Sequence, residues 1–475
     1  MCTHVMTLTE TTLHEISYNR DHCRTGIVHV GVGAFHRSHQ AAYIDELLSI
    51  EGQQDWGIVG VNLRSQESPI LEQLVEQDHR YVLKTVSSEG AASFREIGSI
   101  LTTYDWSVDQ LVAANIVGSE YVHMITLTVS ESGYYLFDDG ALDLNSPPIK
   151  EGVHHGSGSS IYTYLRAALT VRRDLGGAPI TVLSCDNLRH NGDKLKSGFE
   201  QFLRACSDDV LLAWVAENVT FPNCMVDRIT PRMEPAHALE VQQKFNVDDH
   251  LTVMSESFIQ WVVEDKFAGK RPPLELVGVE VVKDIEPYEE AKIRILNGAH
   301  TVVAYLAALK SYETFDAAIR DPELYELLSG YQLKEVIPTM DNSPIDLVKY
   351  SEVVKQRFLN KNIADSIARI CADGVSKFSI FILITLKNTY AKGIVPHNVI
   401  RGVASWYVFM QHVDKQKIPF FYGEPKWEFI QPLLELGCAV KFSESSILWG
   451  DLPIKHPEFV FSLVDEINNI SDRFL

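Results

Sequence analysis

A lysine, an asparagine and a histidine lie within nine residues of one segment with helical periodicity, at Lys292, Asn297 and His300. At about 100° per residue they fall near 0°, 140° and 80° of a helix, so they share one broad face. A lysine removed from water has a lowered pKa and can act as a general base, while asparagine and histidine can donate hydrogen bonds to an alkoxide or carbonyl oxygen. The alternative is an amphipathic helix with solvated charges, which Glu290 and Arg294 would fit.

A second polar group follows an expected strand, in the run Cys185-Asp186-Asn187. Open α/β sheets bind their ligands at the carboxyl ends of strands. Asn187 could therefore complete an oxyanion-stabilising pair with Asn297. The alternative is that Asp186 and Asn187 cap the turn or helix that follows.

Three more charged residues are candidates for binding a substrate. Asp227 could hold a hydroxyl group or could simply pair with its neighbour Arg228. Arg369 and Lys377 are separated by an Asp-Gly pair that is expected to end a helix, so both can point into one cleft. Placement on the surface is the alternative for these two cations.

A glycine-rich turn lies between an expected strand and an expected helix. Glycines at such a turn let the backbone approach a pyrophosphate, which then lies over the helix N-terminus. The third glycine of GxGxxG is replaced by histidine, and an arginine follows in the first helical turn, where a cation opposes the helix dipole unless an anion neutralises it. A turn with no ligand is the alternative. The candidate cofactor contacts are Gly31, Gly33, Phe35, His36 and Arg37.

The end of the second expected strand bears on the choice of nucleotide. Dinucleotide sites commonly place an acid there to bind the ribose 2′-hydroxyl. Here the strand is followed by Arg64 and Ser65, and the nearest acid is Glu67. Arg64 could accept a 2′-phosphate, which favours NADP over NAD, or could be a solvated loop charge.

The pattern of apolar segments predicts the fold class. Strand-like runs in the first half alternate with helical segments such as 160–175, which indicates a doubly wound parallel sheet. Helical periodicity prevails in the second half. The strand-like runs are 27–30, 57–62, 81–86, 122–128 and 180–184, and the later helical segments are 254–264, 288–310, 324–336, 377–390 and 399–412. We expect an α/β fold with a Rossmann-like N-terminal domain over residues 1–217 and a mostly α-helical substrate-binding domain over 218–475.

Composition and missing motifs narrow the function. With 42 basic and 63 acidic side chains among 475 residues the net charge is −21, which argues against a nucleic-acid partner. Seven scattered cysteines without a CxxC pair, no signal-like N-terminus and no apolar run long enough to span a membrane indicate a cytoplasmic protein. No HExxH, Walker or GxSxG motif is present. A lysine base and a nucleotide fold without a metal motif point to metal-independent hydride transfer.

The glycine run, Cys185-Asp186-Asn187, the segment 225–229 and the element KxxxxNxxH occur in this order over nearly the whole chain. Together they resemble the mannitol dehydrogenase family of polyol-specific long-chain dehydrogenases and reductases. The resemblance implies that Lys292 is the general base and that Asn297 and His300 hold and orient the reacting oxygen. It also implies that Asn187 completes the oxyanion site and that Glu289 gives the lysine a proton path.

The resemblance further implies that Asp227, Arg369 and Lys377 contact polyol hydroxyl groups. Within the family, segments 185–192 and 287–297 are most similar to D-arabinitol dehydrogenases. We therefore expect oxidation of D-arabinitol to D-xylulose or D-ribulose with NADP or NAD, the reverse reduction, and D-mannitol oxidation to D-fructose as a further reaction. The alternatives are a mannitol 2-dehydrogenase, a fructuronate reductase and, outside enzymes, a nucleotide-binding redox sensor. A monomer or weak homo-oligomer is expected.

Overall fold

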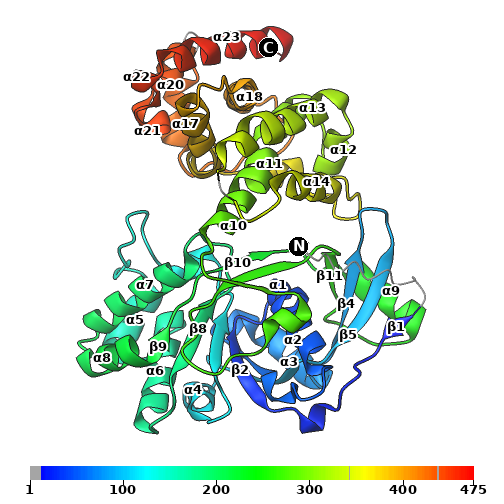
Figure 1. The fold of residues 1–475 in the computed structure, drawn as a ribbon, viewed down its shortest axis with the longest axis vertical. Coiled ribbons are helices and arrows are strands. Elements are labelled where there is room, and N and C mark those ends of the chain that lie inside the picture. The colour runs from blue at the N-terminus through cyan, green and yellow to red at the C-terminus, as the bar shows by residue number, and fades with distance from the viewer. Residues whose placement is uncertain (1–11, 342, 436–437, 475) are drawn as a thin grey trace. The chain divides into compact units, whose positions relative to one another are not determined.

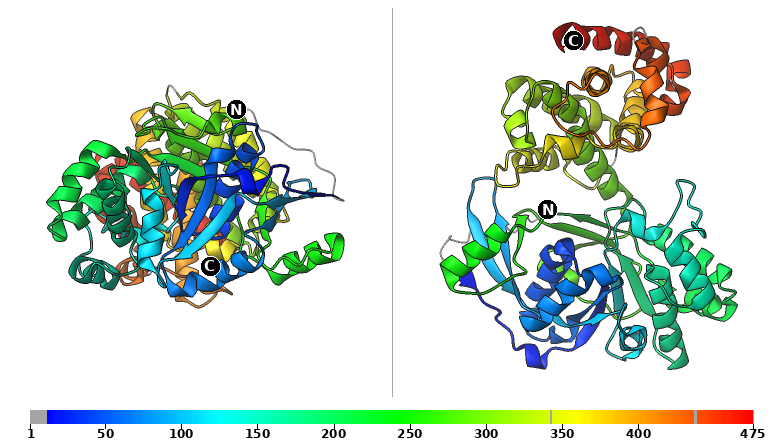
Figure 2. Two further views of the ribbon diagram at one scale, coloured as in Figure 1. Left: turned by 90° about the horizontal axis from the view of Figure 1, so that it is seen from below. Right: turned by 180° about the vertical axis from the view of Figure 1, so that it is seen from behind.

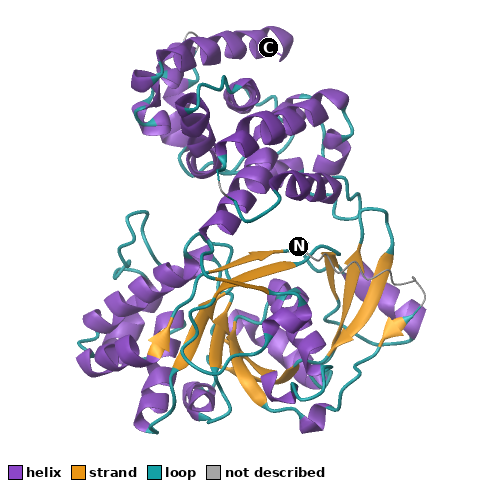
Figure 3. Ribbon diagram, in the orientation of Figure 1, coloured by secondary structure: helices purple, strands orange, loops and turns teal. Residues whose placement is uncertain are grey.

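The computed structural model describes residues 12–341, 343–435 and 438–474, which form two compact units. The first unit continues to Ser87 and resumes from Ala91 to Ile285; the second contains Ser88–Gly90 and the chain from Glu286 onward. The division expected between residues 217 and 218 therefore lies inside the first unit. Within the described residues every named strand belongs to the first unit (Figure 3).

The first unit is built on a parallel six-stranded sheet. Its spatial order is β6-β3-β2-β7-β8-β9, and every neighbouring pair is parallel. In order of first appearance along the chain this is 3-2-1-4-5-6, the Rossmann order, which confirms the expected fold class. The strands are β2 (Thr25–Val30), β3 (Gly57–Asn62), β6 (Ile100–Asp105), β7 (Met124–Leu127), β8 (Ile180–Ser184) and β9 (Val219–Thr220).

Helices cover both faces of this sheet, as Figures 1 and 2 show. Neighbouring residues of β2 face separate apolar cores: Ile27 packs into one core with α2 (Gln40–Leu48) and α3 (Ser68–Glu76). Val28 packs into the other with α6 (Ile161–Asp174) and α7 (Asn191–Ala205). Because side chains alternate along a strand, a continuous apolar run fills both cores.

Two smaller sheets explain where the first unit ends. One has the order β1-β5-β4-β11 and the other β10-β12-β13. Since β11 pairs with β4, and β9 pairs with β8, residues beyond 217 complete sheets of the first unit. The strands are β1 (Leu13–His14), β4 (Tyr81–Val86), β5 (Ala92–Ile97), β10 (Cys224–Asp227), β11 (Val253–Glu256), β12 (Gln260–Glu264) and β13 (Glu280–Val282).

The prediction of a helix over residues 254–264 is therefore wrong. Segment 254–264 forms parts of two strands, β11 and β12, which are buried along their whole lengths. A short run buried on both faces has no alternation, so its periodicity cannot distinguish a strand from a helix. The run 81–86 is a strand as expected, but it belongs to the four-stranded sheet and not to the Rossmann sheet.

The second unit is helical, as expected, and three of its expected helices contain π-helical segments. These are Lys292–Asn297, Tyr331–Val336 and Phe378–Ile382. The first lies between α10 (Glu286–Ala291) and α11 (Gly298–Leu309), the second follows α13 (Pro322–Gly330), and the third precedes α17 (Leu383–Ala391). Helices α11 and α18 (His397–Asp414) contribute many residues to the apolar core of the unit. π-Helical turns are rare and are often found at functional sites.

Across the described ranges, no helix is both long enough and apolar enough to cross a membrane. Among the same residues, no group of three or more His, Cys, Asp or Glu side chains is arranged to hold a metal ion. The described cysteines, which form no disulfide, are Cys23, Cys185, Cys206, Cys224, Cys371 and Cys438.

Candidate active site

The glycine turn after β2 is held by the ends of two neighbouring strands. Gly31 has φ +98°, and a Cβ there would lie 2.1 Å from the carbonyl oxygen of Thr128, so glycine is required. The Thr128 hydroxyl donates to the Gly31 carbonyl oxygen at 2.8 Å. On the other side, the Val32 N–H donates to Asn62 Oδ1 at 2.7 Å. The turn is therefore fixed at the point where the strand order of the sheet reverses.

The geometry after this turn fits the pyrophosphate of a dinucleotide. Gly33 is the N-cap of the short helix α1 (Ala34–Ser38), and no side chain caps its first turn. A Cβ built on Gly33 would meet nothing within 4 Å, so the space over the helix start is open. Uncapped backbone N–H groups at a glycine turn can bind an anion.

Two of the expected cofactor side chains point elsewhere. Arg37 is completely buried, its Nη1 donates to the carbonyl oxygen of Leu251 at 2.5 Å, and its guanidinium lies 5.4 Å from the centre of the Tyr81 ring. His36 is buried too and stacks on His29, with 3.4 Å between ring centres. The expected anion contact of the Arg37 side chain is therefore wrong, because a carbonyl group and an aromatic face inside the domain bind this cation.

Burial also lowers the pKa of both Arg37 and His36. Phe35 is half-buried and stacks on His39, with 5.0 Å between ring centres. Of the candidate cofactor contacts in this segment, the two glycines and the backbone of the first helical turn lie at the open space, and the cofactor contact expected of Phe35 stays a prediction.

Arg64 stands just beyond the end of β3. Its backbone N–H donates to the carboxylate of Glu67 at 3.4 Å, and its side chain is half-exposed. Among the residues that the structure describes, no carboxylate forms an ion pair with its guanidinium. This cation therefore stands where an acid would bind a ribose 2′-hydroxyl in an NAD site.

The loop that carries Asn187 is anchored by the residue before it. The Asp186 carboxylate accepts hydrogen bonds from the Ser130 N–H at 2.7 Å, the Val129 N–H at 3.1 Å and the Tyr134 hydroxyl at 2.8 Å. Burial raises the pKa of Asp186, although these three bonds oppose the rise. Asp186 therefore joins the loops after β7 and β8 and does not cap α7, whose N-cap is a different residue. Asn187 is exposed beside this anchor.

A second anchor joins the Asn187 loop to the strand that carries Asp227. Asn191 Oδ1 accepts the Cys224 N–H at 3.0 Å, while Asn191 Nδ2 donates to the carbonyl oxygens of Cys224 at 2.8 Å and of Asp186 at 3.0 Å. Gly192 permits this approach, because a Cβ there would lie 2.4 Å from the Pro222 carbonyl oxygen.

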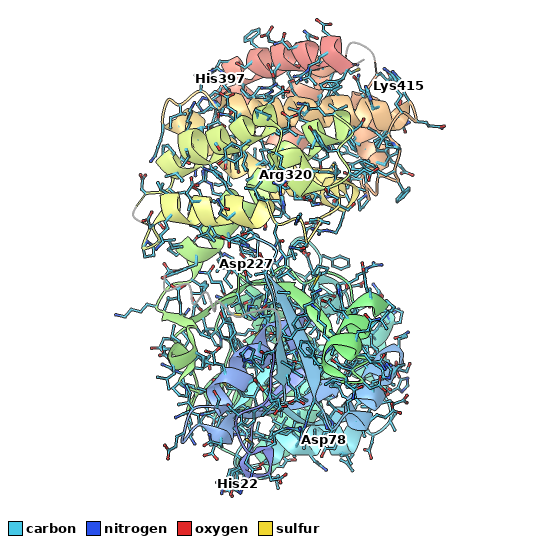
Figure 4. All side chains as sticks on the ribbon, turned by 90° about the vertical axis from the view of Figure 1, so that its right-hand side faces the viewer. His22, Asp78, Asp227, Arg320, His397 and Lys415 are labelled. Carbon is cyan, nitrogen blue, oxygen red and sulfur yellow. The ribbon has the colours of Figure 1, made fainter. Side chains whose placement is uncertain are left out.

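Asp227 is buried at the end of β10, opposite Gln260 of β12. It lies at the other end of the first unit from His22 and Asp78 (Figure 4). The neighbouring Arg228 donates to the backbone carbonyl oxygens of Glu256, at 3.0 Å, and Ser38.

In the second unit, Lys292 and Asn297 are the first and last residues of one π turn. The Gly298 N–H binds the Ile293 carbonyl oxygen, which is the i→i+5 bond that defines a π-helix. Lys292 is buried, and Glu289, also buried, lies one helical turn before it. In a π turn, residues five apart lie on the same face, whereas in an α-helix they diverge by about 140°.

The π turn aligns the whole KxxxxNxxH element. A single extra residue in a helix makes positions i, i+5 and i+8 equivalent to i, i+4 and i+7 of an uninterrupted α-helix, about 40° and −20° from the first. Lys292, Asn297 and His300 therefore form a narrow stripe, where the regular helix would have spread them over a broad face.

Arg294 excludes the alternative of a solvated amphipathic helix. Its side chain is fully buried, and it donates to Glu290 at 2.8 Å, to Thr385 Oγ1 at 3.2 Å and to Thr339 Oγ1. A buried arginine with these partners fixes the π turn against neighbouring segments.

His300 is packed between two aromatic rings and lies near the two expected substrate cations. Its ring stacks on Phe358 at 4.2 Å and contacts the edge of Phe315 at 4.3 Å. Burial lowers the pKa of His300 to about 3, Asp365 opposes the change, and Arg369 and Lys377 add to it. The imidazole is therefore neutral at physiological pH.

Arg369 and Lys377 occupy different settings near this histidine. The exposed Arg369 guanidinium pairs with Asp365, with 2.6 Å between Nε and Oδ1. Lys377 Nζ donates to the Ile370 carbonyl oxygen at 2.7 Å, and burial lowers its pKa. The two cations lie near each other, since the charge of Arg369 contributes to the lowered pKa of Lys377, but Arg369 lies on the surface, which was the alternative for it.

The candidate residues form two groups, each held within its own unit. The sequence did not predict several residues that hold the glycine turn, the Asn187 loop and the π turn through hydrogen bonds. Their only mark in the sequence is a polar side chain at the end of an apolar strand or within a helical run. The first unit holds Gly31, Gly33, Arg64, Asn187 and Asp227, the second holds Glu289, Lys292, Asn297, His300, Arg369 and Lys377, and the supporting residues missed are Asn62, Thr128, Asn191, Tyr331 and Gln332.

The parallel sheet order and the open glycine turn at its reversal point define a Rossmann-type nucleotide-binding protein. The sequence matches the description "Mannitol dehydrogenase Rossmann domain" over residues 25–276 and "Mannitol dehydrogenase C-terminal domain" over residues 284–441. The chain belongs to the mannitol dehydrogenase family.

Relatives support this assignment along the whole chain. A D-arabinitol 4-dehydrogenase of Klebsiella pneumoniae is 36% identical over 428 residues, which cover 90% of this chain and 94% of the relative. The crystal structure of a substrate-free D-sorbitol dehydrogenase has a TM-score of 0.91 at 32% identity, covering 97% of this chain and 96% of that one. Pseudomonas fluorescens mannitol 2-dehydrogenase, in a ternary complex with NAD and D-mannitol, has a TM-score of 0.82 at 34% identity, covering 97% and 94%.

Proposed function

We propose that this polyol dehydrogenase oxidises D-arabinitol to a ketopentose, D-xylulose or D-ribulose, and catalyses the reverse reduction without a metal ion. The observation that carries the proposal is the stripe of Lys292, Asn297 and His300 produced by the π turn. It places a buried lysine beside two groups that can bind the same substrate oxygen. The similarity to D-arabinitol 4-dehydrogenase supports the choice of polyol.

Lys292 is the proposed general base. Its neutral Nζ accepts the proton of the reacting hydroxyl group, and the hydride leaves the same carbon, so that a C=O double bond forms. Glu289, one turn away on the same helical face, passes the proton on from Lys292. Because only the neutral amine accepts a proton, oxidation is faster at alkaline pH.

Asn297 and Asn187 donate hydrogen bonds to the oxygen as negative charge develops on it. His300, neutral and fixed between Phe315 and Phe358, orients the same oxygen. The remaining hydroxyl groups of the polyol are the proposed ligands of Asp227 from the first unit and of Arg369 and Lys377 from the second.

A bound nicotinamide dinucleotide supplies the hydride acceptor. The backbone around Gly31 and Gly33 would hold its pyrophosphate, since the space over the start of α1 is open. Arg64 favours NADP, because it provides a positive charge for a 2′-phosphate at a position without an acid.

Initial rates of NADPH and NADH formation with D-arabinitol, D-mannitol and sorbitol, at neutral and alkaline pH, test this proposal. We expect the highest kcat/KM with D-arabinitol and NADP. Activity on D-arabinitol with NAD alone would keep the substrate and reject the role of Arg64.

A second candidate is oxidation of D-mannitol to D-fructose, which is favoured by the similarity to the mannitol 2-dehydrogenase that binds NAD and D-mannitol. The same rates distinguish the two candidates. If none of the three polyols reacted while a hexuronate were reduced, a fructuronate reductase would replace both.

A further inference from the structure

The π turn between α10 and α11 frees the backbone carbonyl group of Arg294, which an α-helix would use. In an α-helix the Gly298 N–H would bind the carbonyl oxygen of Arg294, four residues earlier. Here it binds Ile293 instead. A buried carbonyl group that loses its helical donor needs another partner, so the π turn depends on donors from outside its own helix.

The second π segment provides a donor for this carbonyl group and another for the carbonyl group that follows it. The Tyr331 hydroxyl donates to the Arg294 carbonyl oxygen at 2.9 Å, and Gln332 Nε2 donates to the Ile295 carbonyl oxygen at 3.0 Å. Tyr331 and Gln332 are the first two residues of Tyr331–Val336, and both are fully buried. Neither bond involves the side chains of the catalytic stripe.

Gly298 makes room for this arrangement. A Cβ on Gly298 would lie 2.1 Å from the Tyr331 hydroxyl oxygen and 3.1 Å from the ring carbon that bears it. The φ of Gly298 is −62°, an ordinary helical value, so backbone conformation does not require glycine here. Glycine is required here because the Tyr331 side chain approaches so closely.

We propose that Tyr331 and Gln332 are positioning residues that hold the π register of Lys292–Asn297, with Gly298 as the residue that admits them. They act on the backbone of the turn, and the turn places the general base and the oxyanion donor on one stripe. This inference rests on the proposed catalytic roles of Lys292 and Asn297.

Full-length Tyr331→Phe, assayed for polyol oxidation, tests the inference. Without the hydroxyl group the Arg294 carbonyl loses its donor and the turn can relax toward α-helical register. We expect kcat to fall about 10- to 100-fold, with KM changed much less, because small misplacements of reacting groups have costs of this size. The pH of half-maximal kcat should also move by more than about half a unit, since the surroundings of Lys292 change.

Tyr164→Phe is the matched control. Tyr164 is a buried tyrosine of the first unit whose hydroxyl donates to the Ala113 carbonyl oxygen at 3.3 Å. The Tyr164→Phe variant loses a hydrogen bond from a tyrosine hydroxyl to a backbone carbonyl group, as Tyr331→Phe does, but at a position far from the π turn in sequence. It should lower thermal stability while leaving kcat and its pH profile unchanged. Equal effects of both variants on kcat would overturn the inference.

Gly298→Ala provides an independent route to the same result. The added methyl group displaces the Tyr331 hydroxyl, so kcat should fall as in Tyr331→Phe, and the double variant should lose less than the product of the two single losses. Multiplicative losses would show that the two residues act separately and would overturn the inference. If Lys292→Ala retained turnover, the proposed role of Lys292 as the general base would fail; if it lost turnover, and Tyr331→Phe kept kcat and its pH profile, only the positioning role would fail.

Discussion

The side-chain amide of Asn191 binds both backbone hydrogen-bonding groups of Cys224. Asn191 Oδ1 accepts the Cys224 N–H at 3.0 Å, and its Nδ2 donates to the Cys224 carbonyl oxygen at 2.8 Å. Asn191 follows the loop of Asn187 by four residues, and Cys224 begins the strand that ends at Asp227. One buried side chain thus fixes the distance between a proposed oxyanion donor and a proposed substrate ligand.

Replacing Asn191 by leucine should weaken both the fold and substrate binding. The buried N–H and carbonyl groups of Cys224 would lose their partners, which costs about 2–6 kcal/mol of unfolding free energy for the two together. We expect a higher KM for D-arabinitol, measured by steady-state kinetics, and a lower midpoint in denaturant unfolding. Asn218→Leu is the control, since Asn218 Nδ2 donates only within its own helix, to Trp214. An unchanged KM in Asn191→Leu would contradict the role.

Lys292→Ala should remove most of the turnover and leave cofactor binding intact. A positioned general base contributes about 100- to 10,000-fold to rate, so kcat for D-arabinitol should fall by that range. Binding of the dinucleotide, followed by protein fluorescence, should not change, because the glycine turn belongs to the first unit.

The control for this variant is Lys310→Met, at the C-cap of the helix that carries His300. Lys310 pairs there with Asp321 and Glu323, so its loss should lower stability without lowering kcat. A near-normal kcat in Lys292→Ala would reject the lysine-base mechanism.

Local patterns were sufficient to predict the Rossmann fold class and four of the six strands of its sheet, but not β6 and β9. The predicted turn at Gly31 and the apolar runs of β2, β3, β7 and β8 depend on neighbours in sequence, and the structure confirms them. Segment 254–264 was misassigned because burial on both faces removed the alternation that marks a strand. The partner of β11 is β4, which lies more than 100 residues earlier in the chain. The sequence near residue 254 therefore could not reveal this pairing.

The partner of Arg37 and the register of the π turn also depend on residues that are distant in sequence. The dipole argument for Arg37 failed because the carbonyl group that binds it belongs to Leu251. The spacing of Lys292, Asn297 and His300 predicted a shared face, yet a wheel at 100° per residue could not show the narrow stripe. That stripe needs a π turn, and its donors come from Tyr331 and the residue after it.

Arg64→Ala should change the cofactor preference. A charged hydrogen bond to a 2′-phosphate contributes about 1.5–3 kcal/mol, so KM for NADP should rise about 10- to 150-fold while KM for NAD stays nearly constant. Arg24→Ala is the control, because Arg24 is an exposed arginine of the same unit that faces Asp55. Equal KM values for NADP in wild type and Arg64→Ala would show that this cation does not bind the phosphate.

Stability should fall in acid partly because of His29, which supports the glycine turn. Its ring nitrogens bind Thr126 Oγ1 at 2.8 Å and Thr128 Oγ1 at 3.0 Å, and burial lowers its pKa from 6.5 to about 3. Between about pH 3 and pH 6.5, His29 binds a proton in the unfolded chain but not in the folded chain. The stabilisation is therefore complete above pH 6.5 and is lost as the pH falls toward 3, by up to about 1.4 kcal/mol per pH unit.

His29→Asn removes the proton uptake by this histidine on unfolding and should therefore weaken the dependence of the unfolding free energy on pH. We expect denaturant unfolding between about pH 4.5 and 6.5 to give a slope of unfolding free energy against pH that is smaller in the variant by up to about 1.4 kcal/mol per unit. The slope isolates the proton, whereas the lost hydrogen bonds lower stability at every pH. His250→Asn, which replaces an exposed histidine, is the control variant. Parallel curves for wild type and His29→Asn would show that His29 takes up no proton on unfolding, and acid sensitivity would then belong to other buried groups such as His300.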